Sequence, residues 1–491
     1  MLGASSYRQS PARPFNEWPN AYRSDFIAVR LPILATVGIL AMVVGGLFNG
    51  VNGPAGLGEL SAEGALTGTA IIIMSAVLSG SVLDVRGLQA LLLYMPLAVC
   101  VLLSYAVNAD EIKAAHFLGR EGPEKFRSSL LVLSLYLTLF YSYFCLMAVF
   151  GVKSVLRVGG QAAMLAAWML IVEMSVEVLT WFIPPLRGIW LSIRHLWTSS
   201  TSAELHRLVG FGSEPSFGAI SSLGLMGLLA VPLAEAGWRP SAFDRRTWLA
   251  VVTLVALFLF QLIGDARTFL AGAFGAALGG VLMSRPLRRL PASVKSATIM
   301  LAPLIAQAIA IYTVYQGAPG TRTVSNIGRT VGMLTATKLW SQHPILGLGL
   351  GQYGFHFRAE VPSWGLQSWE ISRFFRDAQF DLIGGLPPSY SIFSRLATEL
   401  GIVGFLAWVL PPIYAMRRAL TRAPGRLTTL LFCALAAQIW TGLSLDSFRN
   451  VYYWLWLAGL LALPGAAKPA PRPADAVGTP RSRIRTAEAM Q

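Results

Sequence analysis

Acidic and basic side chains stand close together in short polar segments between long apolar segments of the chain. Asp265 and Arg267 share one such segment, and Asp446 and Arg449 share another. Charged groups near membrane depth are costly, so they are first candidates for a functional site. An arginine guanidinium forms paired hydrogen bonds to phosphate oxygens. These residues predict a site for a polyanion such as a diphosphate. The alternative is that each arginine binds a carboxylate and locks two helices together.

Further charged residues stand near or within other apolar segments. Glu173 and Glu177 are four residues apart, so they share one face of a helix. Four more charged residues flank apolar segments: Arg207, Glu214, Arg322 and Arg329. We expect them to lie on the same side of the membrane as the two short polar segments. The set as a whole favours a polyanion site over isolated structural pairs.

A glycine-rich stretch, residues 343–354 (HPILGLGLGQYG), has Gly349, Gly351 and Gly354 in the spacing of a dinucleotide fingerprint. That fingerprint needs a strand before it and a helix after it in a βαβ unit, and neither pattern surrounds this stretch. Dinucleotide binding is therefore excluded. Because glycine lets a backbone approach other atoms closely, we expect these glycines to contact another surface or a sugar.

The elements that must position these residues are transmembrane helices. The chain has 491 residues, of which 54% are hydrophobic and 13% charged, whereas about 25% of residues are charged in soluble domains. About twelve apolar runs approach the roughly 20 residues that a helix needs to cross a bilayer. The three cysteines, Cys100, Cys145 and Cys433, lie in apolar runs, so a disulfide framework is excluded. The sequence predicts an all-α polytopic membrane protein with about twelve transmembrane helices, within residues 31–463.

Basic residues beside the apolar runs predict the orientation of the chain. Most Lys and Arg fall in short segments on the side of the N-terminus, which is therefore expected to be cytoplasmic. Both termini then lie in the cytoplasm, residues 1–30 as a polar segment and residues 464–491 as a disordered tail. The net charge of +15 follows from this topology and from attraction to anionic lipid, and no nucleic-acid-binding module is recognisable.

Two long loops, residues 184–215 and 316–388, fall on the opposite, periplasmic side. The second is too long for a simple connection and is expected to form a cap. Its residues 364–381 interleave aromatic and charged side chains, which indicates an amphipathic helix. This helix lies either on the membrane surface or packed on the mouth of the bundle. No repeat of the kind found in many secondary transporters is recognisable.

The stretch 343–353, preceded by Arg329 and Trp340, resembles the long-loop signature of the O-antigen ligase/Wzy-type polymerase superfamily. Three further stretches resemble that family and occur in its order: residues 207–218 (RLVGFGSEPSFG), 264–268 (GDART) and 394–404 (SRLATELGIVG). The polymerases of the family have an Arg-x10-Gly pattern in both large loops. Arg207 with Gly218 and Arg373 with Gly384 fit that pattern.

The resemblance implies a GT-C-like glycosyltransferase of the bacterial inner membrane that works at the periplasmic face without a metal or other cofactor. We expect it to polymerise polyprenyl-diphosphate-linked oligosaccharide repeat units into O-antigen, capsule or exopolysaccharide. Membrane lipids and a chain-length regulator are the expected partners beside the lipid-linked substrate. Two alternatives stay open: an O-antigen ligase that transfers glycan to lipid A or protein, and a transporter or flippase.

Roles for individual residues follow from this resemblance. Arg207, Arg267 and Arg329 are expected to stabilise the leaving diphosphate. Glu214, Asp265 or His356 is expected to deprotonate or orient the acceptor hydroxyl. Substrate contacts are expected from a wider set: Arg322, Gly349, Gly351, Gln352, Tyr353, Arg373, Tyr390, Glu399, Asp446 and Arg449.

Tyr390 marks a departure from the family. Ligases of the family place a His nine residues before a helix Glu that matches Glu399, and here that position is Tyr390. A phenol, with a reference pKa of about 10, is a poor base at neutral pH, so Tyr390 favours a polymerase over a ligase. Arg194 and Arg358 lie outside the matched stretches and are expected to tolerate substitution by Ala.

Overall fold

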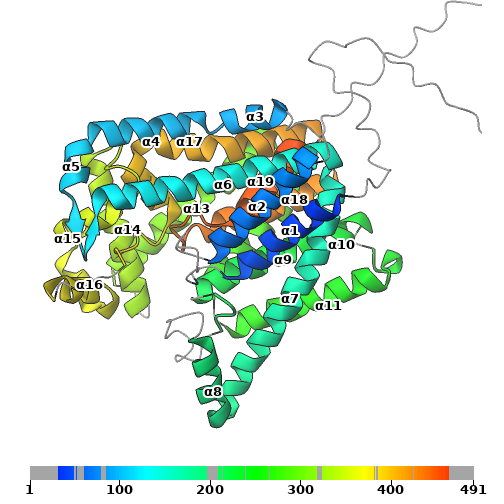
Figure 1. Cartoon of the computed structure of the whole chain (residues 1–491), viewed down its shortest axis with the longest axis horizontal. Coiled ribbons are helices and arrows are strands. Elements are labelled where there is room, and N and C mark those ends of the chain that lie inside the picture. Colours follow the sequence, from blue (N-terminus) through cyan, green and yellow to red (C-terminus); the bar gives the residue numbers. More distant parts are fainter. Residues whose placement is uncertain are drawn as a thin grey trace, which may run out of the picture.

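A computed structural model describes residues 31–48, 51, 60–78, 85–195, 208–212, 214–237, 239–264, 266–317, 323–380, 382, 385–423 and 425–463. Both terminal segments, 1–30 and 464–491, lie outside the described residues. So do three predicted site residues, Arg207, Asp265 and Arg322. Regular structure in the described part of the chain is almost entirely helical, as predicted (Figure 1).

Within the described residues, six helices are long and apolar enough to cross a membrane: α6 (Gly122–Phe150), α7 (Val152–Phe182), α9 (Pro215–Leu229) continued by α10 (Val231–Glu235), α11 (Arg245–Ile263), α13 (Ala292–Tyr315) and α17 (Ile392–Arg422). Shorter apolar helices accompany them: α1 (Ile33–Gly45) with η2 (Gly46–Phe48), α2 (Leu60–Leu78), α4 (Met95–Val107), α12 (Arg267–Met283), α18 (Arg426–Thr441) and α19 (Val451–Ala462). The chain is therefore an all-α protein with membrane-spanning helices, and the number of twelve spans stays a prediction.

The core of the bundle forms around α19, which runs beside α6 and α18 (Figure 1). Every residue of α19 is buried, including Trp454 and Trp456. A helix that is hydrophobic on all sides belongs in the interior. In contrast, α13 exposes large apolar side chains such as Ile305 and Ile309, which suits a helix on the lipid-facing side of the bundle.

The described part of the long loop, from residue 323 to residue 380, folds into a helical cap at one end of the bundle (Figure 1). It contains α14 (Val324–Gln342), α15 (Tyr353–Glu360), the 3-10 helix η5 (Ser363–Gln367) and α16 (Trp369–Gln379). These helices share a small hydrophobic core of their own. The predicted amphipathic helix corresponds in part to α16, in which Ile371 and Phe374 are buried, while Trp369 and Phe380, the residue after the helix, are exposed. Its buried side chains pack against α14 and η5 of the cap, and whether the exposed side chains lie on a membrane surface stays a prediction.

Several short elements were not predicted. A two-stranded hairpin, β1 (His116–Phe117) and β2 (Arg120–Glu121), joins α5 (Ala109–Ala114) to α6. The first long loop contains α8 (Pro184–Arg194), which folds back on α7 (Figure 1). The remaining short helices are α3 (Val85–Leu92) and η4 (Pro240–Ala242).

Candidate functional site

The glycine-rich stretch docks on a break in α17. Gly401 has φ 63° and ψ −168° inside that helix, so helical hydrogen bonding is interrupted there. The stretch supplies new partners: Leu348 N–H donates to the Thr398 carbonyl (3.0 Å), and Gly349 N–H donates to the Glu399 carbonyl (2.8 Å). In return, Ile402 N–H donates to the Pro344 carbonyl (2.8 Å). Buried backbone groups need partners, and the loop and the broken helix satisfy each other.

Close approach of two backbones explains the glycines at this contact. A Cβ on Gly401 would lie 2.1 Å from the Ile345 carbonyl oxygen, and one on Gly347 would lie 2.4 Å from the Glu399 carbonyl carbon. Gly347 also has φ 67°, which disfavours other residues. The glycines of this stretch were expected to contact either another surface or a sugar. For Gly347 the contact is with another protein surface, and Gly401 is the glycine on the opposite side of that contact.

Four neighbouring residues that were predicted to contact the substrate take part in the same packing. Gly349 and Gly351 have φ of 106° and 81°. The buried Gln352 side chain donates to the Gly122 carbonyl (3.0 Å), and the buried Tyr353 hydroxyl donates to the Gly332 carbonyl (2.8 Å). Gln352 and Tyr353 hold the loop against α6 and α14, so the contacts of these two side chains are with the protein itself.

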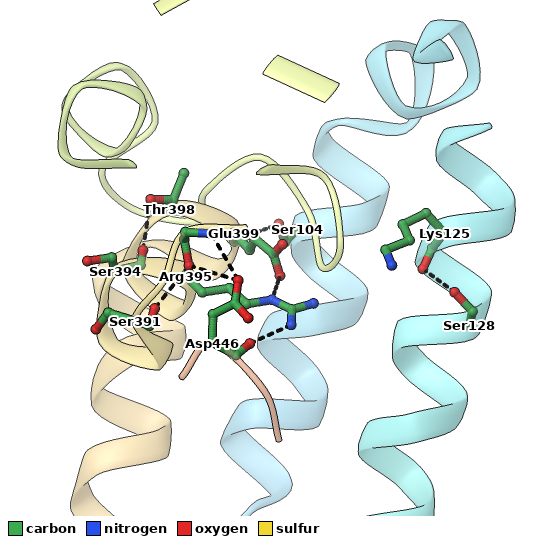
Figure 2. Close-up of polar contacts among 10 residues, drawn as sticks. Ser104, Lys125, Ser128, Ser391, Ser394, Arg395, Thr398, Glu399 and Asp446 are labelled. Atoms are coloured by element: carbon green, nitrogen blue, oxygen red, sulfur yellow. Dashed lines mark hydrogen bonds and ion pairs between the residues drawn. The ribbon is translucent and has the colours of Figure 1, made fainter. Parts of the chain in front are cut away.

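A first cluster of charges lies below this loop and is called the Arg395 group here: Lys125, Arg395, Glu399, Asp446 and Arg449. Arg395 forms an ion pair with Glu399 (Nε–Oε2 3.1 Å) and donates to the Asp446 carbonyl (2.7 Å) (Figure 2). The Asp446 carboxylate accepts from Ser389 N–H (2.9 Å). The turn after α18 and the start of α17 are therefore fixed to each other through Arg395.

Lys125 was missed by the sequence analysis. It stands near the beginning of α6 and extends toward the rest of the Arg395 group (Figure 2). The charged groups that act on its ammonium are Arg395, Glu399, Arg449 and Asp446. A single Lys at the start of an apolar run forms no recognisable motif. It lies in this cluster because α6 packs beside the elements that carry the other charges.

A second cluster surrounds the half-buried Arg329 of α14 and is called the Arg329 group: Glu214, Arg267, Arg329, Glu370 and Tyr390. A Cβ on Gly328 would lie 2.7 Å from the Glu370 carboxylate, and one on Gly332 would lie 2.6 Å from the Tyr390 ring. Glu370 and Tyr390 therefore lie over the turns of α14 on either side of Arg329. Glu370 was missed because its spacing fits the polar face of α16.

Tyr390 has φ 61°, a conformation that is uncommon and strained for a residue other than glycine. The fixed positions of Ser389, bound to Asp446, and of Ile392, whose N–H donates to the Leu445 carbonyl (2.8 Å), hold the chain on both sides of it. Strained residues of this kind concentrate at functional sites.

Burial and neighbouring charges shift the pKa values in the Arg329 group. Protein atoms packed around the partly exposed Glu214 raise the pKa of its carboxyl above the usual 4.5, Arg329 opposes that rise, and Glu370 adds to it. Burial, followed by the like charge of Arg267, lowers the pKa of Arg329. Burial and the nearby carboxylates raise the pKa of Tyr390, so its phenol stays neutral. The group thus combines two guanidinium groups, two carboxyls, one of them with a raised pKa, and a neutral phenol.

Arg267 begins α12 and is exposed, with its guanidinium donating to the Asn326 side chain of α14. Asp446 acts on both Glu214 and Lys125, so the Arg329 and Arg395 groups adjoin. The structure therefore brings together seven predicted site residues: Glu214, Arg267, Arg329, Tyr390, Glu399, Asp446 and Arg449.

Two predicted residues have other surroundings. His356 is half-buried on α15, where burial lowers its pKa and the charges acting on it are Glu111 and His343. Arg373 lies on the surface of α16, paired with Asp377 (3.8 Å). Among the described residues, no cluster of three His, Cys, Asp or Glu side chains could hold a metal ion.

Arg194 has partners that the sequence analysis did not predict. It is 1% exposed and forms ion pairs with Glu177 and with Glu173 (3.6 Å), which tie α8 to α7. Glu177 also accepts from Val209 N–H (2.9 Å). The structure therefore argues against the expectation that Arg194 tolerates Ala, because its loss would leave two buried carboxylates without their cation.

Comparison with known proteins yields no match, either to a protein-family model or to a curated protein.

Proposed function

We propose that the chain is a glycosyltransferase that polymerises polyprenyl-diphosphate-linked oligosaccharide repeat units at the outer face of a bacterial inner membrane, with both termini in the cytoplasm, a GT-C-like fold and twelve spans. The proposal extends the sequence resemblance to the described site. Its reactive centre is the Arg329 group.

One observation carries the proposal. Arg329 is half-buried, and a second guanidinium, Arg267, acts on it beside a carboxyl of raised pKa, Glu214. Arg329 has Glu214 and Glu370 as neighbouring carboxylates, and the exposed Arg267 adds a second guanidinium whose repulsion a further anion would offset. A diphosphate supplies that anion, and guanidinium groups match its oxygens.

In the proposed reaction, the hydroxyl oxygen of the acceptor sugar forms a bond to the anomeric carbon of the donor. The bond from that carbon to the diphosphate oxygen breaks, and polyprenyl diphosphate leaves with the electron pair. Arg267 and Arg329 stabilise the negative charge that develops on it. Glu214 accepts the proton of the acceptor hydroxyl, and the Tyr390 phenol donates a hydrogen bond to the substrate. Glu214 is favoured over His356 as the base because it lies in the Arg329 group.

A single-substrate assay tests the function. Purified protein supplied only with a lipid-linked repeat unit is expected to produce a ladder of longer lipid-linked glycans. A ligase would give no ladder, because its acceptor is absent. Long chains accumulating on polyprenyl diphosphate in a deletion strain would also contradict the polymerase and support the ligase. Transport of the lipid-linked unit without a new glycosidic bond would support the transporter.

A further inference from the structure

We propose that Lys125 forms a second anion site, which holds the diphosphate of the lipid-linked acceptor while the Arg329 group holds that of the donor. This inference rests on the proposed function and names its second substrate site. A polymerase of this type needs two such sites, because both of its substrates carry a polyprenyl diphosphate.

Among the described residues, the ion pair and hydrogen bonds formed within the Arg395 group do not use the Lys125 ammonium. Arg395 is bound to Glu399 and to the Asp446 carbonyl, while the Asp446 carboxylate accepts from Ser389. Within the described part of the chain, no carboxylate lies within ion-pair distance of the Lys125 ammonium. A half-buried cation without a paired anion is unfavourable, and a phosphate oxygen would compensate it.

Packing holds the Lys125 side chain in place. A Cβ on Gly351 would lie 3.3 Å from Lys125 Cγ and 3.0 Å from its carbonyl oxygen. The glycine-rich stretch therefore covers the aliphatic part of the Lys125 side chain. Its ammonium extends toward the other residues of the Arg395 group (Figure 2). This contact gives Gly351 an indirect part in substrate binding: it lets the loop lie close enough to position Lys125.

The location of Lys125 suits a lipid diphosphate. It stands three residues after the start of the membrane-spanning helix α6 (Gly122–Phe150), and a long basic side chain near the end of such a helix can reach the headgroup region. Asp446 acts on both Lys125 and Glu214, so a diphosphate at Lys125 would lie next to the reactive centre. An acceptor anchored there can present its sugars to the Arg329 group.

Binding stoichiometry tests the inference without requiring activity. Full-length protein in nanodiscs of neutral lipid is titrated with farnesyl diphosphate, a short diphosphate probe. We expect two equivalents for the wild type, one for Lys125→Gln, and two for Lys125→Arg. The control is Arg127→Gln, an exposed cation two residues along α6, which should still bind two. A melting temperature for each variant identifies any that misfold, and if Lys125→Gln does, Lys125→Met replaces it as the uncharged variant of similar length and should bind one equivalent.

Each outcome separates the inference from the proposed function. One equivalent in the wild type, lost in Arg329→Gln but kept in Lys125→Gln, would overturn the second site alone. Two equivalents without glycan elongation would support the second site and contradict the polymerase. Displacement of the second equivalent by phosphatidylglycerol would assign Lys125 to an ordinary lipid headgroup and overturn its role as an acceptor site.

Kinetics supply the matching test in an active protein. With saturating donor, Lys125→Gln is expected to lower kcat/KM for a diphosphate-linked acceptor about tenfold, the effect of losing one charge-assisted contact. The same variant should leave kcat/KM unchanged for the repeat unit carried on a neutral aglycone. An equal loss for both acceptors would instead make Lys125 a structural residue.

Discussion

Two regions of the molecule contain arginine and carboxylate side chains in close proximity, and they differ in how those charges are matched. In the first, Arg194, Glu173 and Glu177 are each at most 3% exposed, and the arginine is bound by both carboxylates. In the second, the half-buried Arg329 has a second guanidinium acting on it and a carboxyl of raised pKa beside it. In the first region, the loss of one charge would leave its buried partners uncompensated, whereas in the second region the charges act on one another without closing into buried ion pairs among the described residues and stay available to a ligand.

The largest effect on stability is expected when Arg194 is removed from its ion pairs with Glu173 and Glu177. Arg194→Ala should lower the free energy of unfolding by about 3–5 kcal/mol, the usual result of removing one partner of a buried ion pair. The measurement is the melting temperature in detergent, with the exposed Arg358→Ala as the matched control. A double variant, Arg194→Met with Glu177→Gln, should recover part of the loss. An Arg194→Ala protein as stable as the wild type would remove the distinction between the two regions.

Arg194 also illustrates what the sequence could and could not predict. The apolar helices were predictable because a membrane span imposes a length and a composition on the chain. The partner of Arg194 was not, because Glu177 lies in a different helix and no local motif marks the pair. The same holds for the glycine-rich stretch, whose function depends on the break at Gly401 some fifty residues later. Glu370 and Lys125 were missed because the pairing of elements, which local sequence does not encode, places them at the site.

Substitutions in the Arg329 group should lower activity and leave the stability of the fold unchanged. Arg329→Lys is expected to reduce polymerisation about 100- to 1000-fold, the usual cost of losing one transition-state donor, because an ammonium cannot reproduce the guanidinium fork. Arg267→Lys should act in the same direction. The melting temperature of both variants should match the wild type. Near-normal ladders from a folded Arg329→Ala protein would exclude this residue from the reaction.

The pH dependence sharpens the contrast further. Glu214 acts as a base only when ionised, so activity should fall as the pH drops through its pKa, which burial holds above 4.5. Glu214→Gln should lower activity about 100-fold at neutral pH and remove this acidic limb. Because Glu370 raises the pKa of Glu214, Glu370→Gln should move the limb to lower pH. A limb that stays in place in both variants would assign the proton to another group.

The smallest effect is expected at Tyr390, whose neutral phenol is proposed to donate one hydrogen bond to the substrate. Tyr390→Phe should lower kcat/KM about tenfold or less, because a single neutral hydrogen bond contributes about 0.5–1.5 kcal/mol. Tyr390→His places an imidazole where ligases of the resembling family have one. If Glu214 is the base, this variant should gain no activity and should form no bond to lipid A. Its backbone must still adopt φ near 61°, which His tolerates about as well as Tyr, so both variants should fold. Ligation to lipid A by the Tyr390→His protein would mean that the acceptor reaches this position directly, and would make the choice between polymerase and ligase depend on this one side chain.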